Sequence, residues 1–144
     1  MLLILGPGYS GTALAGAARA AGHEVLGVKR QAAEGVMAFD DPALPRAIQA
    51  ATHVLSSVPP DSATGRDPML DRFAEHLKGH GGWVGYLSST GVYGDTGGAW
   101  VDESGPTGAG RRSARSQCEA RWLERGASAF RLPGIYGPGR SILD

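Results

Sequence analysis

The stretch GPGYSG at residues 6–11 carries three glycines in the pattern G-x-G-x-x-G, directly after a short apolar run. In a strand-to-helix turn, the first glycine makes the tight turn, the second lets the backbone approach a pyrophosphate, and the third lets helix and strand pack closely. The pattern therefore predicts a dinucleotide site made by Gly6, Gly8, Tyr9, Ser10 and Gly11. A phosphate loop of the nucleotide-hydrolase type needs a lysine where Thr12 stands, so the sequence excludes it.

Two cationic residues, Lys29 and Arg30, lie at the end of the second apolar run. In a dinucleotide-binding site, the residues at this point distinguish NAD from NADP. NAD enzymes usually carry an acidic residue about twenty residues after the glycines, where it binds the ribose 2′-hydroxyl. No acidic residue follows this run before Glu34, and a guanidinium group suits a 2′-phosphate because it can donate two hydrogen bonds to it. The pair therefore favours NADP, with NAD as the second choice of cofactor and ordinary surface charge as the alternative interpretation.

Short apolar strands alternate with helical segments along the chain. Strands are expected over residues 2–5, 24–28, 53–57, 83–88 and 128–132, and helices over residues 12–21, 42–51, 68–78 and 111–125, with a long loop over 93–110. Such alternation, with near-continuous apolar strands, predicts a parallel sheet covered on both faces. The expected fold is α/β, a Rossmann-type doubly wound sheet in three layers that forms a single domain over residues 1–144, with ligands at the carboxyl ends of the strands.

The composition excludes several kinds of partner and site. Because 14 Lys and Arg balance 14 Asp and Glu, no global field draws the chain to nucleic acid or to a membrane. Cys118 is the only cysteine, which excludes a disulfide framework and a thiolate metal site and fits a reducing, cytoplasmic compartment. His76 and His80 have a spacing that zinc ligands use, but no third ligand accompanies them, so no metal is expected. The apolar start ends at Gly6 and is neither a signal peptide nor a membrane span, which leaves a small molecule as the expected partner.

Two further stretches, YLSSTGVYGDTGGAWVDE (residues 86–103) and FRLPGIYGPGR (residues 130–140), carry a family resemblance. Together with the glycine turn they resemble the NAD(P)-dependent epimerase/dehydratase family, in the extended and atypical branch of the short-chain dehydrogenase/reductase superfamily, which has a Rossmann fold. The resemblance implies that Ser89 is the catalytic hydroxyl, which hydrogen-bonds the hydroxyl or carbonyl of the substrate; the alternative is a hydroxyl that only caps the loop. It also implies cofactor contacts from Asp40, beside the adenine, and from Ser57, Val58 and Pro59, in the loop after a central strand.

The sequence departs from that family at its central Tyr-x-x-x-Lys pair, since no tyrosine here has a lysine four residues later. Counting back from Glu119 gives Arg115 at the lysine position and Arg111 at the tyrosine position. A guanidinium group keeps its proton, so Arg111 cannot act as a general base, although the pair could polarise a carbonyl or bind a phosphate or carboxylate. Alternatively, Arg111, Arg115 and Glu119 share a solvated helix face through their i,i+4 spacing. Tyr93 is the nearest other phenol and the remaining catalytic candidate.

Two function classes follow from these residues. One is an NAD(P)-binding oxidoreductase or epimerase-like enzyme that acts on a small or sugar-like hydroxy or keto substrate. The other is a non-catalytic dinucleotide-binding protein, a sensor or a structural protein, that lacks the proton relay. Family members continue well past R-x-x-G-I-Y-G-P-G into a smaller C-terminal region, whereas only residues 140–144 follow it here. The resemblance therefore implies the cofactor half of a longer protein or a shortened relative, with exposed apolar surface and self-association into a homo-oligomer.

Overall fold

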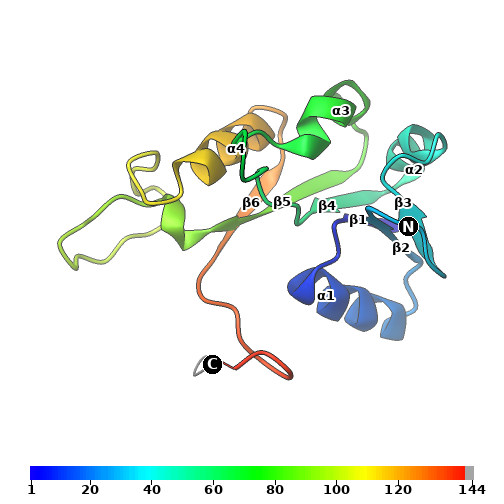
Figure 1. Cartoon of the computed structure of the whole chain (residues 1–144), viewed down its shortest axis with the longest axis horizontal. Helices are drawn as coiled ribbons and strands as arrows, with labels where there is room; N and C mark the ends of the chain where they lie inside the picture. The colour runs from blue at the N-terminus through cyan, green and yellow to red at the C-terminus, as the bar shows by residue number, and fades with distance from the viewer. Residues whose placement is uncertain (142–144) are drawn as a thin grey trace.

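The apolar runs of the sequence form one parallel sheet with the strand order β3-β2-β1-β4-β5-β6 (Figure 1). The structure is a computed structural model and describes residues 1–141. Its strands are β1 (Leu2–Leu5), β2 (Val25–Lys29), β3 (Val36–Ala38), β4 (His53–Ser56), β5 (Trp83–Ser89) and β6 (Ser128–Leu132). This is the strand order of the doubly wound dinucleotide-binding fold, in which ligands bind where the order reverses, beside β1 and β4.

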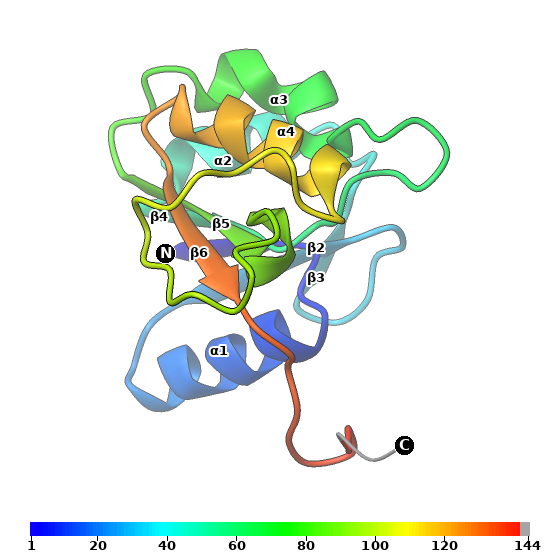
Figure 2. The ribbon, with the colours of Figure 1, turned by 90° about the vertical axis from the view of Figure 1, so that its left-hand side faces the viewer.

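Helices lie on both faces of the sheet, which gives the three layers expected from the sequence. They are α1 (Tyr9–Ala20), α2 (Leu44–Ala50), α3 (Pro68–Leu77) and α4 (Ser113–Leu123), with a short 3₁₀ helix η1 (Thr90–Val92) directly after β5. In Figures 1 and 2, α1 lies on one face of the sheet, and α2, α3 and α4 lie together on the other. No helix in residues 1–141 is long and apolar enough to span a bilayer.

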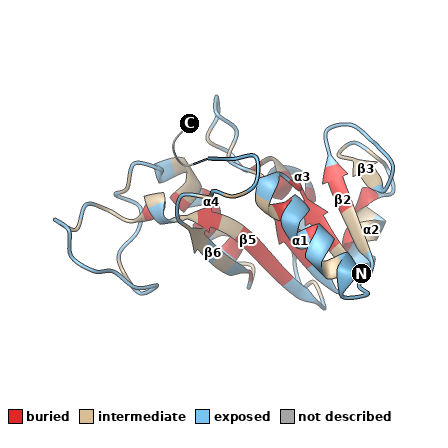
Figure 3. Ribbon diagram, turned by 90° about the horizontal axis from the view of Figure 1, so that it is seen from below, coloured by how far each residue is buried: buried red, intermediate tan, exposed pale blue. Residues whose placement is uncertain are grey.

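The hydrophobic core lies between the sheet and the three helices α2, α3 and α4. The ring of Trp122 on α4 stacks on that of Tyr86 on β5, with centroids 5.6 Å apart, and both side chains are fully buried. Phe73 of α3 and Leu3 and Leu5 of β1 extend this core, and Figure 3 shows buried residues along the central strands. Burying such aromatic side chains supplies much of the hydrophobic stabilisation of a domain of this size.

The opposite face is less well covered at β5 and β6. Because side chains alternate along a strand, Trp83 lies on the face opposite to Tyr86, and Phe130 lies opposite to Arg131, which contacts α4. Trp83 and Phe130 have ring centroids 6.0 Å apart and are 36% and 42% exposed. Trp83 and Phe130 thus expose apolar surface on the face that carries α1.

Three element predictions need correction. The first helix begins at Tyr9 rather than at Thr12, so the last three residues of the glycine motif belong to α1. Strand β3 was not expected, because its three residues are only half-buried and no longer apolar run marks them. The last helix begins at Ser113 rather than at Arg111, and its N-cap, Arg112, makes no side-chain capping bond. Arg111 therefore lies in the turn before α4, and the i,i+4 spacing that would place it on one helix face with Arg115 does not apply.

Candidate functional site

The glycine turn between β1 and α1 adopts a geometry that only small residues allow. Gly6 has φ +70°, and a Cβ there would lie 2.6 Å from Cγ2 of Val58. A Cβ on Gly11 would lie 3.2 Å from Cγ2 of Ile4, so this glycine allows α1 to pack closely on β1. The hydroxyl of Ser57 donates a hydrogen bond to the carbonyl of Gly6 and so fixes the turn against the loop after β4.

The N-terminus of α1 is open toward this turn. Gly8 is the N-cap, no side chain caps the helix, and the first turn carries no acidic residue. The first N–H groups of a helix have no intrahelical acceptor, and the helix dipole makes this end partly positive. Tyr9 and Ser10 stand in this first turn, so the local arrangement suits a phosphate group.

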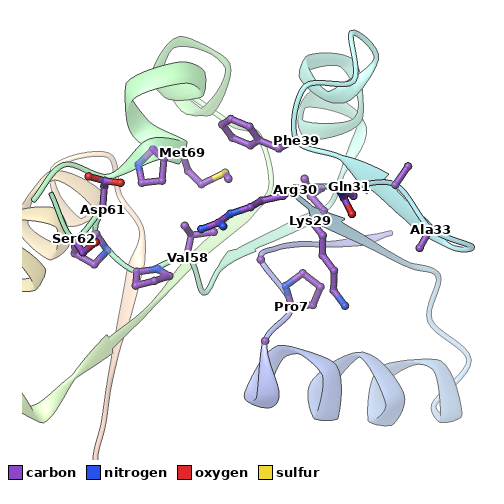
Figure 4. A pocket seen from close by; sticks show the side chains of 17 residues that line it. Pro7, Lys29, Arg30, Gln31, Ala33, Phe39, Val58, Asp61, Ser62 and Met69 are labelled. Carbon is purple, nitrogen blue, oxygen red and sulfur yellow. The ribbon is translucent and has the colours of Figure 1, made fainter. Parts of the chain in front are cut away.

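A large pocket of about 1150 Å³ lies on one side of Gly8, at the carboxyl ends of β1, β2 and β4 (Figure 4). The residues that line it include Gly6, Pro7, Gly8, Lys29, Arg30, Phe39, Val58, Pro59 and Asp61. In Figure 4 the side chain of Arg30 extends across the pocket toward Val58. Asp40, expected beside the adenine, is exposed and does not line the pocket, whereas its neighbour Phe39 does.

Asp61 adds one negative charge to the large pocket. Its Oδ1 accepts hydrogen bonds from the backbone N–H and the hydroxyl of Thr64, at 2.9 and 3.0 Å, and from the N–H of Ala63. These hydrogen bonds, the backbone N–H of Thr64 first, lower the pKa of Asp61, and the positive charge of Arg30 acts in the same direction. The pocket thus combines two cations at the end of β2 with one ionised carboxylate across from them.

A smaller pocket of about 280 Å³ lies on the other side of Gly8. Ser89 of β5 pairs with Leu132 of β6, so the carboxyl ends of these two parallel strands lie side by side at the same edge of the sheet. The polar side chains that line the small pocket are Tyr9, Ser10, Ser57, Ser88, Ser89, Arg112, Arg115 and Arg140. The Oγ of Ser89 accepts a hydrogen bond from the N–H of Gly91 at 3.1 Å and so caps η1, while its own proton remains available for a second partner.

The two arginines at the Tyr-x-x-x-Lys positions do not come together. Arg115 lines the small pocket, and its Nη1 donates to the hydroxyl of Tyr86 at 3.2 Å and to the carbonyl of Leu87 at 3.0 Å. Burial raises the pKa of Tyr86, so this phenol keeps its proton at neutral pH. Arg111 is exposed and lines neither pocket, whereas Arg112, which is also exposed, lines the small pocket.

Tyr93 belongs to a polar network away from both pockets. Its hydroxyl accepts a hydrogen bond from Nη1 of Arg131 at 2.8 Å. The same guanidinium donates to Oε1 of Glu119 through Nε and Nη2, at 2.9 and 2.8 Å, and Glu119 is only 2% exposed. The hydrogen bonds to Glu119 raise the pKa of Arg131 further above its ordinary value. The alternative that Glu119 lies on a solvated helix face is therefore wrong.

Among the pocket residues that sequence reasoning missed are two arginines of the small pocket, Arg112 and Arg140. Arg140 closes the FRLPGIYGPGR motif, and its guanidinium lies over the ring of Tyr9, 5.6 Å from the centroid. The motif thereby folds back on the start of α1, and the hydroxyl of Tyr9 donates to the carbonyl of Pro138 at 3.1 Å. The sequence offered two signals for them. Arg112 is adjacent to the expected Arg111, and Arg140 is the last residue of the motif FRLPGIYGPGR. No group of three His, Cys, Asp or Glu side chains suited to a metal occurs in residues 1–141.

Comparisons with known proteins give matches among solved structures. No protein-family model and no curated protein matches the chain. A conserved protein of unknown function from Silicibacter pomeroyi is 36% identical, with a TM-score of 0.80, over 97% of this chain and 54% of that chain. A protein from Methylobacillus flagellatus, assigned as an NAD-dependent epimerase/dehydratase, is 29% identical, with a TM-score of 0.69, over 96% of this chain and 56% of that chain.

A third structure is similar in fold. The Bordetella bronchiseptica enzyme WbmG, solved in complex with NAD and UDP, is 22% identical, with a TM-score of 0.71, over 94% of this chain and 54% of that chain. This chain therefore spans about half the length of the relatives that it matches. The glycine turn, the motifs at the ends of β5 and β6, and these likenesses together show that the chain is similar to NAD-dependent epimerases/dehydratases over about half of their length, the part that binds the cofactor.

Proposed function

We propose that this chain binds NADP in preference to NAD and forms the cofactor-binding part of an oxidoreductase or epimerase-like enzyme. Its substrate is a small or sugar-like molecule with a hydroxyl or keto group. The single buried cysteine suits a reducing compartment, so the proposal includes a cytoplasmic site of action.

The position of the two pockets carries this proposal. Both are lined by Gly8, and they lie on opposite sides of it, at the point where the strand order reverses. A dinucleotide has two nucleoside halves joined by a pyrophosphate, and such a molecule needs two pockets with an anion site between them. The open first turn of α1, with Gly8 as its N-cap, supplies the anion site.

The residues present fit the adenosine half of NADP. The large pocket has apolar walls from Phe39 and Val58 and a cation pair, Lys29 and Arg30, at the end of β2. A guanidinium group binds phosphate through two parallel hydrogen bonds, which an uncharged ribose hydroxyl cannot match. Asp61 faces the same pocket, and the positive charge of Arg30 contributes to the lowered pKa of its carboxylate.

Bound NADPH would supply a hydride to a keto group, and bound NADP⁺ would accept one from a hydroxyl-bearing carbon. The chain itself offers Ser89, whose free hydroxyl proton can be donated to a substrate oxygen. Arg115, held by Tyr86 and Leu87, adds a fixed positive charge beside the same pocket and can stabilise negative charge that develops on that oxygen. No phenol lines the small pocket at the family's tyrosine position, so we expect slow proton transfer.

A second candidate function is a non-catalytic dinucleotide sensor. The observation that favours it is the exposure of Arg111, which leaves the family's proton-donor position outside the pocket. The two candidates share cofactor binding and differ in turnover. Measured reduction of carbonyl compounds by the NADPH-loaded protein therefore separates them.

The Arg30→Ala variant tests the cofactor assignment. Loss of one charge-assisted phosphate contact should cost about 1.5–3 kcal/mol, so NADP affinity should fall at least about tenfold while NAD affinity stays nearly constant. Isothermal titration of both cofactors into wild type and variant measures this. Arg46→Ala is the matched control, because Arg46 is exposed on α2 and does not line the pocket. Equal NAD and NADP affinities in the wild type would contradict the proposal.

A further inference from the structure

We propose that the small pocket, called here the arginine pocket, recognises a carboxylate or phosphate group of the substrate next to its reacting hydroxyl or carbonyl. The pocket is defined by Ser88, Ser89, Arg112, Arg115 and Arg140. This inference rests on the proposed function and names the substrate class for it. The substrate would be a small hydroxy or keto acid, or its phosphorylated counterpart, rather than a neutral sugar or alcohol.

The charge of the pocket is the first observation. Three guanidinium groups line it, from Arg112, Arg115 and Arg140, and no carboxylate is among the lining residues. Within residues 1–141 none of the three forms an ion pair, although the other cation-lined pocket contains Asp61. Three positive charges without a counter-charge repel one another, and an anionic ligand removes that repulsion.

Unused hydrogen-bond groups are the second, independent observation. The hydroxyl of Ser88 is buried, with the residue only 6% exposed, and it has no hydrogen-bond partner in the described part of the chain. The Nε of Arg115 is likewise buried without a partner, although Nη1 of the same side chain is anchored on Tyr86 and Leu87. Buried donors of this kind almost always have a partner in a functional protein, and an oxyanion accepts several hydrogen bonds at once.

The backbone around Arg112 explains how its side chain is placed without hydrogen bonds. A Cβ on Gly91 would lie 2.8 Å from Cδ of Arg112, so the absence of a side chain at Gly91 lets the arginine stem lie against η1. On the other side of the pocket, Arg140 is held over the ring of Tyr9. Both guanidinium groups are thus positioned by contacts of their stems or faces, and their N–H groups remain available to a ligand.

The size of the pocket and the position of Ser89 restrict the ligand further. The pocket has a volume of about 280 Å³, at the lower end for ligand sites, and the nicotinamide end of the cofactor would occupy its part along Gly8, Tyr9 and Ser10. The substrate, on the side of Ser89 and the arginines, must therefore be small. Because Ser89 and the arginines line the same small pocket, the reacting oxygen and the anionic group belong to the same compact molecule. An arginine at the position of the family's lysine therefore serves in anion recognition rather than in proton transfer.

The test titrates inorganic phosphate and malonate, separately, into the protein saturated with NADP, so that the anion site at the glycine turn is filled. We expect binding of at least one probe and a loss of at least about tenfold in affinity in Arg112→Gln, from one charge-assisted contact. Arg112 makes no hydrogen bond through its side chain within residues 1–141, so its replacement should leave the fold intact. Arg46→Gln, the same charge change on exposed α2, is the matched control and should bind the probes as the wild type does.

The outcomes separate the two anions and the two proposals. Tighter phosphate binding assigns a phosphorylated substrate, and tighter malonate binding assigns a carboxylic acid; both support the inference. Absence of binding to both probes, or equal affinity in wild type, Arg112→Gln and Arg140→Gln, overturns it. If NADP itself does not bind, the proposed function fails, and the same titrations on the cofactor-free protein still test the arginine pocket through its dependence on Arg112.

Discussion

Ser89 ends β5 and Tyr93 follows η1 four residues later, yet their hydroxyls have different surroundings. Ser89 lines the arginine pocket and uses only an acceptor position, on the N–H of Gly91. The Tyr93 oxygen accepts a hydrogen bond from Arg131, and the same guanidinium donates two hydrogen bonds to the buried carboxylate of Glu119. At the level of single residues, we therefore propose Ser89 as the catalytic hydroxyl, whereas Tyr93 is part of the network that joins the loop after β5 to α4 and β6.

Replacing these two hydroxyls separately tests that assignment. Removing one preorganised donor from an active site typically costs about a hundredfold or more in rate, which is the loss expected for Ser89→Ala in NADPH-dependent carbonyl reduction. Tyr93→Phe should retain the activity and lose about 1 kcal/mol of unfolding free energy, because only one hydrogen bond disappears. The measurements are NADPH oxidation with a panel of carbonyl compounds and urea unfolding. Turnover that survives Ser89→Ala, or that vanishes in Tyr93→Phe, would contradict the assignment.

Cys118 should be chemically inert in the folded protein. Its side chain is 1% exposed, its Sγ lies 3.6 Å from the carbonyl of Gly65, and burial raises its pKa to about 11. The unfolded chain releases this proton near the reference pKa of about 8.5, so the group stabilises the fold below that pH, and this contribution disappears as the pH rises toward 11. A disulfide reagent at pH 8 should therefore react slowly with native protein and rapidly after addition of urea. Equal rates in both states would show that the thiol is accessible.

At the scale of elements, Asp67 joins α3 to α4. Its Oδ1 accepts from the N–H groups of Met69 and Leu70, at 2.8 and 3.0 Å, as the N-cap of α3, and its Oδ2 accepts from Nε1 of Trp122 at 2.7 Å. The side chain is fully buried, so both functions depend on one carboxylate. The core stack of Trp122 on Tyr86 is thereby fixed to the start of a neighbouring helix.

Asp67→Ala should therefore destabilise the fold more than an ordinary cap substitution. Loss of the cap costs about 1 kcal/mol, and the unpaired indole N–H adds about 1–3 kcal/mol, which gives a loss of about 2–4 kcal/mol in urea unfolding. Asp67→Asn keeps the oxygen for the cap and should lose less. In the double variant Asp67→Ala with Trp122→Phe, the orphaned donor is absent, so the combined loss should be smaller than the sum of the single losses. If the losses of unfolding free energy in the two single variants add up to that of the double variant, the hydrogen bond between Asp67 and Trp122 contributes nothing to stability.

The elements also show what the sequence could and could not predict. Leu2–Leu5 and Ser128–Leu132 were predicted with their observed ends, because short apolar runs bounded by turn residues signal strands directly. The glycine turn could also be predicted from the sequence, because its function depends on local backbone geometry. Strand β3 was missed because Val36–Ala38 are stabilised by pairing with β2 rather than by a pattern of their own.

The small pocket could not be predicted from local sequence patterns, for a different reason. Its arginines come from the turn before α4, from α4 itself and from the segment after β6, which only the folded chain brings together. Glu119 illustrates the same limit, because its partner Arg131 lies on β6 and no i,i+4 rule connects them. Spacing arguments within one helix therefore placed Glu119 on the wrong face.

At the scale of the whole molecule, the two faces of the sheet are covered unequally. Helices α2, α3 and α4 lie on one face and α1 alone on the other (Figures 1 and 2). The open part carries Trp83 and Phe130, and Leu14 of α1 is also exposed, at 42%. The relatives are nearly twice as long as this chain, which spans 54% of the protein from Silicibacter pomeroyi. Neighbouring exposed aromatic side chains such as Trp83 and Phe130 are typical of a surface that a partner covers.

For the 144-residue chain by itself, we expect the covering partner to be a second copy. Sedimentation velocity over a range of protein concentrations should show reversible self-association, because burying Trp83 and Phe130 removes apolar surface from water. Phe130→Ser should weaken this association at least about tenfold, the value of one buried aromatic contact. Trp100→Ser is the matched control: this indole is fully exposed in the long loop and lies outside the sheet, so its loss should change nothing. Strictly monomeric behaviour at every concentration, or association that depends on Trp100 and not on Phe130, would show that the open sheet face does not mediate contact between copies.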